Sequence, residues 1–285
     1  MVKHAPVATP LPEPKSPASG HPRSGKDFPY WLVATVLIGI VIAVVIVLND
    51  LYWQVFTTVS RGVGITVFVT LTGFALASAL GLLLAVMALS QSIWLRQISR
   101  FYIEVIRGVP ILVLLFYIAF VGAPALVAGW NFLITPLLEA GLVEKMTVRD
   151  FPLVWRASIA LMIGYSAFIA EVFRAGIQAV DEGQIEAAKA LGLSGWHRFR
   201  LIVFPQAIRT ILPPLGNDFV AMVKDSSLVS VLGVADITQM GKVYAAGSFT
   251  FFETYSIVAY IYLVLTIGLS LALRALERRL ALKHS

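Results

Sequence analysis

The sequence predicts an all-α, polytopic membrane protein with six transmembrane helices, and three observations lead to this fold class. Of the 285 residues, 58% are hydrophobic and 13% are charged, which is about half the roughly 25% charged share of a soluble domain. The mean hydropathy is +0.84. Several charge-free runs reach the length of about 20 residues that a helix needs to cross a bilayer. So few charges cannot cover an ordinary water-facing surface.

Charge-free runs place the individual helices. No charged residue separates Asp27 from Asp50, a long apolar run lies between Arg61 and Arg96, and Arg107 is followed by no charge until Glu139. The fifth run is interrupted by charges. In chain order, the predicted spans are 30–48, 63–89, 102–121, 156–175, 211–232 and 254–274. The small residues Gly73, Ala77 and Gly81 recur every fourth position in the second span, which favours close packing of one helix on another.

The segment before the first span is expected to be a disordered, basic leader over residues 1–29. It holds seven of the 14 prolines and too few apolar residues to fold. The first span, 30–48, exceeds the usual apolar core of a signal peptide, and its polar leader is too long for one. We therefore expect a retained N-terminal helix.

Basic residues predict the orientation. Sixteen lysines and arginines fall on one side of the predicted spans and five on the other, and cytoplasmic loops carry the excess of basic residues. Both termini, including the tail at 277–285, and the loop at 175–209 are thus expected in the cytoplasm. The net charge of +6 reflects orientation rather than nucleic-acid binding. The apolar segment Ala125–Leu138 is short for a span and is interpreted as re-entrant or interfacial.

Enzymatic and metal-binding signatures are missing from the sequence. It has no cysteine and four scattered histidines, so it shows no metal-ligand spacing. No lysine stands in the glycine-rich context of a phosphate-binding loop. We expect no catalytic residue, no metal and no cofactor on this chain.

The loop at 175–209 has the pattern of two short helices. Gln184–Leu191 are good helix formers, Gly192 stands where a helix stops, and Ser194 can cap a second helix. Pro205 ends that second helix. Such a helical hairpin below a membrane suits docking to a partner's groove, although an ordinary amphipathic loop has the same pattern.

The sequence of this loop resembles the EAA loop of permease subunits of ATP-binding cassette importers, through Glu186-Ala187-Ala188, Gly192 and Pro205. Arg107-Gly-Val-Pro110 and the stretch Ala167–Ile177 narrow the likeness to the polar amino-acid uptake group. Pro213-Pro214, Gly216-Asn217 and Lys224–Leu228 follow in the same order. Phe168 and Ser226 depart from it, standing where the group usually has tyrosine and threonine.

The resemblance implies a type I importer core of five helices over 62–276, preceded by the extra N-terminal helix. It implies a transport subunit, not an enzyme, in the inner membrane of a bacterium. Its partners would be ATPase subunits that bind MgATP, an extracytoplasmic amino-acid-binding protein, and a second permease copy or sister permease. The substrate would be a polar L-amino acid. The implied ATPase-coupling residues are Gly183, Glu186, Ala187, Ala188, Gly192 and Pro205.

Polar residues inside predicted spans are costly and usually face a pathway or a partner. Asp218 and Asp225 lie seven residues apart, on one helical face, and we expect Lys224 to neutralise one of them. An internal ion pair is as good an explanation as a ligand site. The candidate pathway residues are Asn217, Asp218, Lys224, Asp225, Ser226 and Ser227. Glu171 and Arg174, three apart in the fourth span, suggest a gate or an interhelical lock.

Three alternatives share some of these features. An importer of a related zwitterion, such as an opine or an ectoine-like solute, would need the same subunits. An ion-driven secondary transporter usually shows internal repeats, and we find none in the sequence. A membrane scaffold without transport activity would leave the intramembrane charges unexplained.

Overall fold

The computed structural model describes residues 30–282, and within this range it contains helices and connecting turns but no strand. This agrees with the predicted all-α fold class. The predicted leader at 1–29 lies outside the described residues. The helices are α1 (Tyr30–Leu48), α2 (Asp50–Val59), α3 (Val63–Ala88), α4 (Ile93–Gly108), α5 (Ile111–Tyr117), α6 (Ala123–Leu133), α7 (Thr135–Glu139), α8 (Leu153–Gln178), α9 (Glu182–Ala190), α10 (Gly195–Arg198), α11 (Phe204–Asp225), α12 (Ile237–Ser248) and α13 (Phe251–Leu282).

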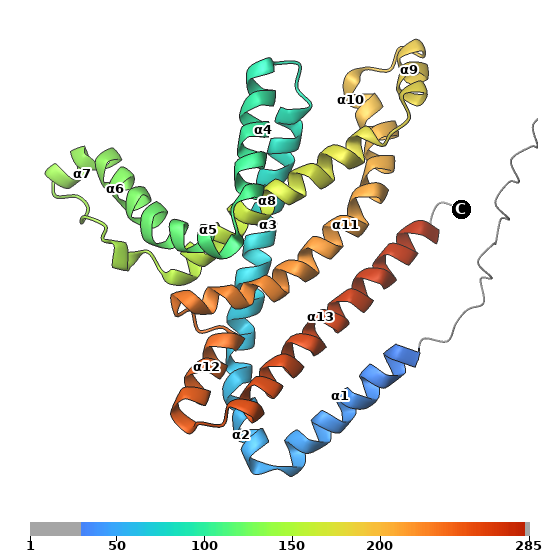
Figure 1. Ribbon diagram of the computed structural model, residues 1–285. Coiled ribbons are helices and arrows are strands. Elements are labelled where there is room, and N and C mark those ends of the chain that lie inside the picture. The colour runs from blue at the N-terminus through green and yellow to red at the C-terminus, as the bar shows by residue number, and fades with distance from the viewer. Residues whose placement is uncertain (1–29, 283–285) are drawn as a thin grey trace, which may run out of the picture. The chain divides into compact units, whose positions relative to one another are not determined.

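The chain divides into two units, residues 1–38 and residues 39–285. In the second unit, α3 packs most extensively against α8, and the two helices cross in Figure 1. The predicted stripe of small residues makes this packing possible: Gly73, Ala77 and Gly81 are all buried on α3. A Cβ atom at Gly81 would lie 2.9 Å from Ile169 Cγ2 of α8. Small side chains thus let the two helices approach closely, as predicted.

A second apolar cluster joins α2, α12 and α13, through the buried Val55, Ile237 and Ile257. At the start of α3, Gly62 touches the backbone of Asp236, which caps α12. The side chain of Asp236 accepts hydrogen bonds from the backbone N–H groups of Thr238 and Gln239 at 3.2 and 2.8 Å. These contacts fix α12 beside the lower end of α3 in the view of Figure 1.

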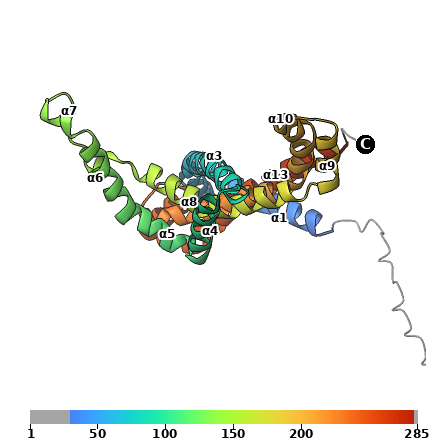
Figure 2. The same cartoon turned by 90° about the horizontal axis from the view of Figure 1, so that it is seen from above.

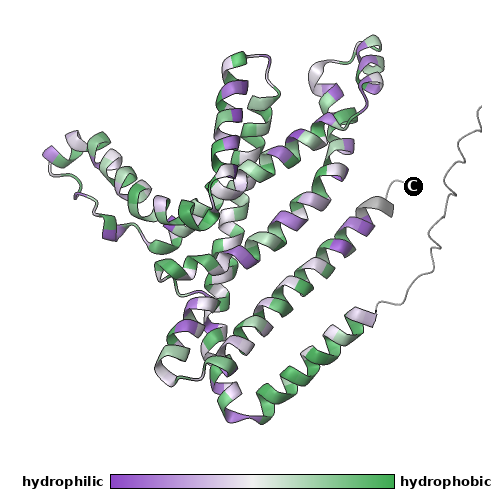
Figure 3. Ribbon diagram, in the orientation of Figure 1, coloured by the Kyte–Doolittle hydropathy of each residue, from purple (hydrophilic) through white to green (hydrophobic). Residues whose placement is uncertain are grey.

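Five helical segments are long and apolar enough to cross a membrane. They are Tyr30–Leu48, Asp50–Ala88, Ile111–Leu133, Leu153–Gln178 and Phe251–Arg279. In Figure 3, α1 is hydrophobic along most of its length, whereas α9 is largely hydrophilic. The predicted fifth span, 211–232, corresponds to α11 and the 3₁₀ turn that follows it. That helix contains Arg209, Asp218, Lys224 and Asp225 and is not among the five, so the sixth span stays a prediction.

The predicted third span, 102–121, has the wrong bounds. Its helix breaks at Val109-Pro110, both of which are extended, because the residue before a proline is pushed out of the helical region. The apolar helix instead starts at Ile111 and continues to Leu133. The segment Ala125–Leu138 is therefore not a separate re-entrant element, since its first part belongs to this helix. The predicted tail at 277–285 begins inside α13, which remains helical to Leu282, and its cytoplasmic location stays a prediction.

Two π-helical turns interrupt longer helices, at Ile118–Gly122 and Phe199–Val203. Each is followed by a proline two residues later, Pro124 and Pro205. Proline cannot donate a backbone hydrogen bond, and its ring collides with the carbonyl group four residues back in an α-helix. A wider turn just before the ring relieves part of this conflict. Each helix therefore passes its proline without ending.

The connection from α6 to α8 is tied back to α6. Asn131 Nδ2 donates a hydrogen bond to the carbonyl of Met146 at 2.7 Å, and Met146 N–H donates one to Asn131 Oδ1 at 2.9 Å. Figures 1 and 2 show α6 and α7 extending away from the α3–α8 pair, on the side opposite α9 and α10.

Candidate functional site

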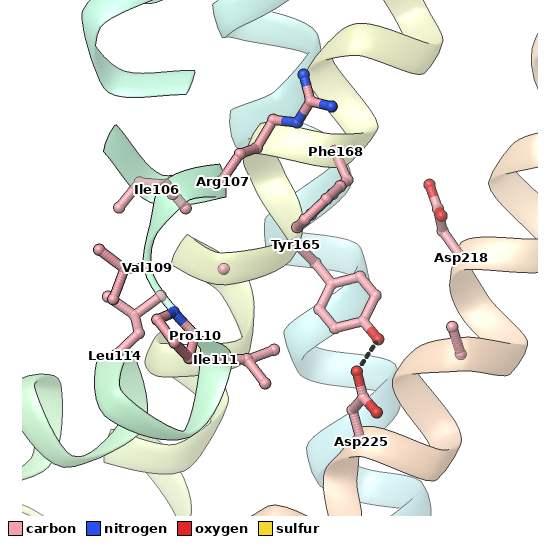
Figure 4. Close-up of a pocket in the computed structure, with 13 residues that line it drawn as sticks. Ile106, Arg107, Val109, Pro110, Ile111, Leu114, Tyr165, Phe168, Asp218 and Asp225 are labelled. Carbon is pink, nitrogen blue, oxygen red and sulfur yellow. Dashed lines mark hydrogen bonds between the residues drawn. The ribbon is translucent and has the colours of Figure 1, made fainter. Parts of the chain in front are cut away.

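The break between α4 and α5 opens a cavity inside the helical bundle. Pro110 holds φ at −57° and ψ at 136° and has no N–H group, so the helical hydrogen bonds stop with Val109 N–H to Ile106 and resume with Leu114 N–H to Pro110. Irregular backbone at membrane depth is tolerated where it lines protein or a cavity. The cavity has a volume of about 550 Å³ and is bounded by the α4–α5 break, the middle of α8, and α11. Figure 4 shows its side chains.

Four polar or charged side chains reach this cavity from three helices. Tyr165 of α8 donates a hydrogen bond from its hydroxyl to Asp225 Oδ2 of α11 at 2.7 Å. Asp218 also lines the cavity, and its Oδ2 atom is buried without a hydrogen-bond partner among the described residues. The guanidinium of Arg107, at the end of α4, lies 5.6 Å from the ring centre of Phe168. Figure 4 shows both aspartates on α11, with Arg107 above them at the end of α4.

Two of the six predicted pathway residues line the cavity, Asp218 and Asp225. They share one face of α11, as their spacing predicts. Asn217 and Lys224 are exposed, and Ser227 is half-buried outside the cavity lining. Ser226 is fully buried and donates its hydroxyl to the carbonyl of Val223 at 2.7 Å. Within residues 30–279, no ion pair joins Lys224 to either aspartate. The six predicted pathway residues therefore lie on different faces of this segment, and two of them reach the cavity.

Tyr165 was not singled out in the sequence, and Arg107 was noted only as part of a motif. A tyrosine in the middle of an apolar run is a weak signal, because its ring suits a core equally well. What marks Tyr165 is the aspartate that lies opposite it, 60 residues later in the chain. That pairing depends on how α8 packs against α11, which a single sequence does not report.

Glu171 and Arg174 form an ion pair within α8, with Arg174 Nη2 2.5 Å from Glu171 Oε2. Arg174 also donates to Gln178 Oε1 at 2.7 Å. The pair is thus intrahelical rather than a bridge between helices. Both residues line a second, polar cavity of about 410 Å³ against α4, to which Arg107 also contributes. Arg107 therefore stands between the two cavities.

The loop after α8 folds into the two predicted short helices. The side chain of Asp181 accepts a hydrogen bond from Gln184 N–H and caps α9, and that of Ser194 accepts one from His197 N–H and caps α10. Between them, Gly192 has a φ of +74°. Gly192 N–H donates to the carbonyl of Lys189 at 2.9 Å, and Leu193 N–H donates to that of Ala188 at 3.1 Å. This is the hydrogen-bond pattern of a Schellman C-cap, which favours glycine.

The loop presents both charged and apolar side chains outward. Glu186 and Ala187 are exposed on α9, whereas Ala188 is buried. Leu191 is 80% exposed and Trp196 is 65% exposed, although neither was singled out in the sequence. Exposed apolar side chains beside charged ones are typical of a surface that meets a partner. Figure 1 shows α9 and α10 together at one end of α8 and α11.

The two remaining predicted coupling residues, Gly183 and Pro205, lie at the start of α9 and at the start of α11. Gly183 lies next to the cap, where a Cβ atom would be 2.9 Å from Asp181 Oδ1. Pro205 stands in the first turn of α11. Gln206 donates from Nε2 to Gln184 Oε1 at 2.5 Å and so ties α11 to α9. The helix that this hydrogen bond connects to α9 is the one that carries Asp218 and Asp225.

Comparison with known proteins gives the class of this protein. Residues 77–282 match the model of the binding-protein-dependent transport system inner membrane component. The chain belongs to this family. It is thus a permease, the membrane subunit of an ATP-binding cassette importer, in which a separate chain carries the ATPase. This confirms the predicted family and the prediction of a transport subunit. As a member with several long apolar helices, it is a multi-pass inner-membrane protein.

Particular relatives carry amino-acid transport in their names. The glutamine transport system permease protein GlnP of Escherichia coli is 36% identical over 80% of this chain and 95% of that protein. The probable amino-acid permease protein YxeN of Bacillus subtilis is 35% identical over 82% of this chain and 98% of that protein. A crystal structure of an amino acid ABC transporter with histidines shares 37% identity. It covers 80% of this chain and 95% of that chain, with a TM-score of 0.64.

Proposed function

We propose that this permease imports a polar L-amino acid, which an extracytoplasmic binding protein delivers to the cavity at the α4–α5 break. The observation that carries the proposal is the charge content of this cavity. Arg107 can bind a carboxylate, and Asp218 and Asp225 can bind an ammonium group. A mostly apolar cavity with a few convergent polar groups is the usual form of a small-molecule site.

The substrate pathway in this proposal consists of Arg107, Tyr165, Asp218 and Asp225. The break between α4 and α5 brings Arg107 to the cavity, and the packing of α8 on α11 brings the other three. Transporter sites near the middle of the membrane are typically formed by discontinuous helices, and this cavity lies at such a discontinuity. The Glu171–Arg174 pair, in the neighbouring polar cavity, would act as a gate on the path toward α9.

The ATPase would bind the surface formed by α9 and α10, with Glu186 as the main polar contact and Leu191 and Trp196 as apolar contacts. Closure of the ATPases around MgATP would move α9, and the Gln184–Gln206 hydrogen bond would carry that movement to α11. The permease would then alternate between two conformations. ATP on one side and the loaded binding protein on the other would each shift the equilibrium between them.

The assembly would contain two ATPase subunits and either two copies of this permease or one copy and a sister permease. The excess of lysine and arginine at the termini and in the loop at 175–209 supports a cytoplasmic location for both termini and α9. The binding protein would then meet the opposite face.

The test is uptake of labelled polar amino acids by proteoliposomes that contain this chain, the ATPase encoded with it, and the binding protein. Glu186→Lys reverses the charge at the centre of the docking surface, whereas Glu139→Lys makes the same change on the exposed α7. We expect uptake to require ATP and to fall at least tenfold in Glu186→Lys, whereas the ATPase should still co-purify with Glu139→Lys. The ATPase should no longer co-purify with Glu186→Lys. Uptake driven by an ion gradient without ATP would overturn the proposal.

A further inference from the structure

The charges that line the cavity do not balance. Arg107 is its only basic residue, and Asp218 and Asp225 are its two acidic residues, among 13 lining residues that are otherwise uncharged. Lys224, next to Asp225 in the chain, is exposed and is not part of the lining. Neither carboxylate forms an ion pair within the described residues, and the lining holds one basic side chain for two acidic ones.

The two aspartates also differ in their hydrogen bonds. Asp225 accepts one hydrogen bond from the hydroxyl of Tyr165. The Oδ2 atom of Asp218 is buried and accepts none. A buried carboxylate oxygen without a donor is strongly unfavourable. Asp218 is thus positioned to accept a hydrogen bond from a ligand that enters the cavity.

We infer that the cavity selects amino acids whose side chain carries a second positive charge. This inference rests on the proposed function and adds the substrate class to it. Such a molecule has one carboxylate and two cationic groups, and the cavity has one guanidinium and two carboxylates. A neutral amino acid would leave one of the two carboxylates without a counter-ion, and an acidic amino acid would add a third negative charge.

The walls of the cavity suit the rest of such a molecule. Ile111 and Leu114 supply apolar contacts for an aliphatic stem, and Tyr165 and Phe168 supply aromatic rings. Long basic side chains bury their methylene groups against apolar surface while their charged end is paired. A volume of about 550 Å³ also lies within the range of about 300–1,000 Å³ that is common for small-molecule sites.

The test compares two amino acids of nearly the same shape and different charge. L-arginine and L-citrulline differ by the replacement of a guanidinium with a neutral ureido group. Equilibrium binding of each labelled amino acid is measured on the full permease with its ATPase in nanodiscs, without the binding protein. Omitting the binding protein removes its own selectivity from the result. We expect arginine to bind at least tenfold more tightly than citrulline or glutamine.

Variants at Asp218 test whether the cavity is the source of this preference for a charged side chain. Asp218→Asn should weaken arginine binding at least tenfold and leave citrulline binding nearly unchanged, so that the preference for charge is lost. Asp218→Glu should retain it. Glu139→Gln, the same change of charge on the exposed α7, should behave as wild type. Retained citrulline binding by Asp218→Asn shows that the variant is folded.

Failure of the inference and failure of the proposed function give different results. If citrulline or glutamine binds the wild-type protein as tightly as arginine, the inference is overturned, while ATP-dependent uptake of amino acids still supports the proposed function. A preference for arginine that Asp218→Asn leaves intact also overturns the inference. If no amino acid binds or is taken up with ATP, the proposed function itself is wrong.

Discussion

At the scale of single residues, the contact between Gly62 and Asp236 shows how little space separates parts of this bundle. A Cβ atom at Gly62 would lie 2.4 Å from the backbone carbonyl carbon of Asp236 and 2.5 Å from Ile237 N. Backbone atoms at the end of a capped helix cannot move aside as a flexible side chain can. The residue that precedes α3 therefore has to be glycine for α12 to dock.

Gly62→Ala should consequently lower the stability of the protein, by about 1–3 kcal/mol as for other overpacked sites. Gly64→Ala is the matched control, because a Cβ atom at Gly64 meets nothing within 4 Å. Replacing an exposed helical glycine by alanine is neutral or slightly stabilising. Thermal unfolding in detergent, followed by the fluorescence of the native tryptophans, compares the two. Equal unfolding temperatures for the two variants would contradict the contact described here.

At the scale of elements, the connection between α6 and α8 depends on Asn131. Its side chain satisfies both backbone groups of Met146, and a typical hydrogen bond contributes about 0.5–1.5 kcal/mol. The connection is otherwise exposed over residues 139–145. Asn131 therefore holds this part of the connection, while the carbonyl groups of Val148 and Phe151 further along it accept hydrogen bonds from Arg156 of α8.

Asn131→Ala should release this connection without unfolding the bundle. We expect faster hydrogen exchange at residues 143–150 and faster proteolytic cleavage there, with unchanged exchange in α3 and α8. Thr135→Val removes a hydroxyl that bonds only within its own turn, to the carbonyl of Asn131, and serves as the control. Protection that stays the same in Asn131→Ala would show that the turn is held by other contacts.

Some elements could be predicted from the sequence because a local rule decides them. The stripe of Gly73, Ala77 and Gly81 predicted the packing of α3, and the position of Gly192 predicted the turn between α9 and α10. The break at Pro110 was not predicted, because the predicted span was begun at residue 102, across Glu104 and Arg107, and the average hydropathy of a segment does not register a change in the direction of the chain. The directions of Lys224 and Ser226 were also not predictable, since they depend on how α11 is rotated against α8.

At the scale of the whole molecule, the number of membrane spans depends on whether α11 crosses the membrane. It carries too many charges for a span by composition alone, yet Asp218 and Asp225 line the cavity rather than the outer surface of the bundle. A charged residue that faces a cavity is tolerated in a membrane where one that faces lipid is not. We therefore expect α11 to cross the membrane, which gives six spans and places both termini on the same side.

The protein contains no cysteine, so single cysteines can report this topology directly. Gln91→Cys, Ala190→Cys and Val243→Cys place a thiol at exposed positions before α4, at the end of α9 and in α12. We expect a membrane-impermeant maleimide to label Val243→Cys in intact spheroplasts, and to label the other two only after permeabilisation. Labelling of Ala190→Cys together with Val243→Cys would mean that α11 does not cross.

The π-helical turn at Phe199–Val203 has a consequence for how this molecule tolerates insertions and deletions. A π turn contains one residue more than an α-helical turn, and each residue advances an α-helix by about 100°. Deleting one residue there would restore regular helical geometry but rotate everything before it by about that angle relative to α11. The side of α9 and α10 that we propose to bind the ATPase and the cavity-facing side of α11 would then no longer be aligned. The proposed docking surface and the cavity, on one continuous stretch of chain, are thus aligned by a single additional residue.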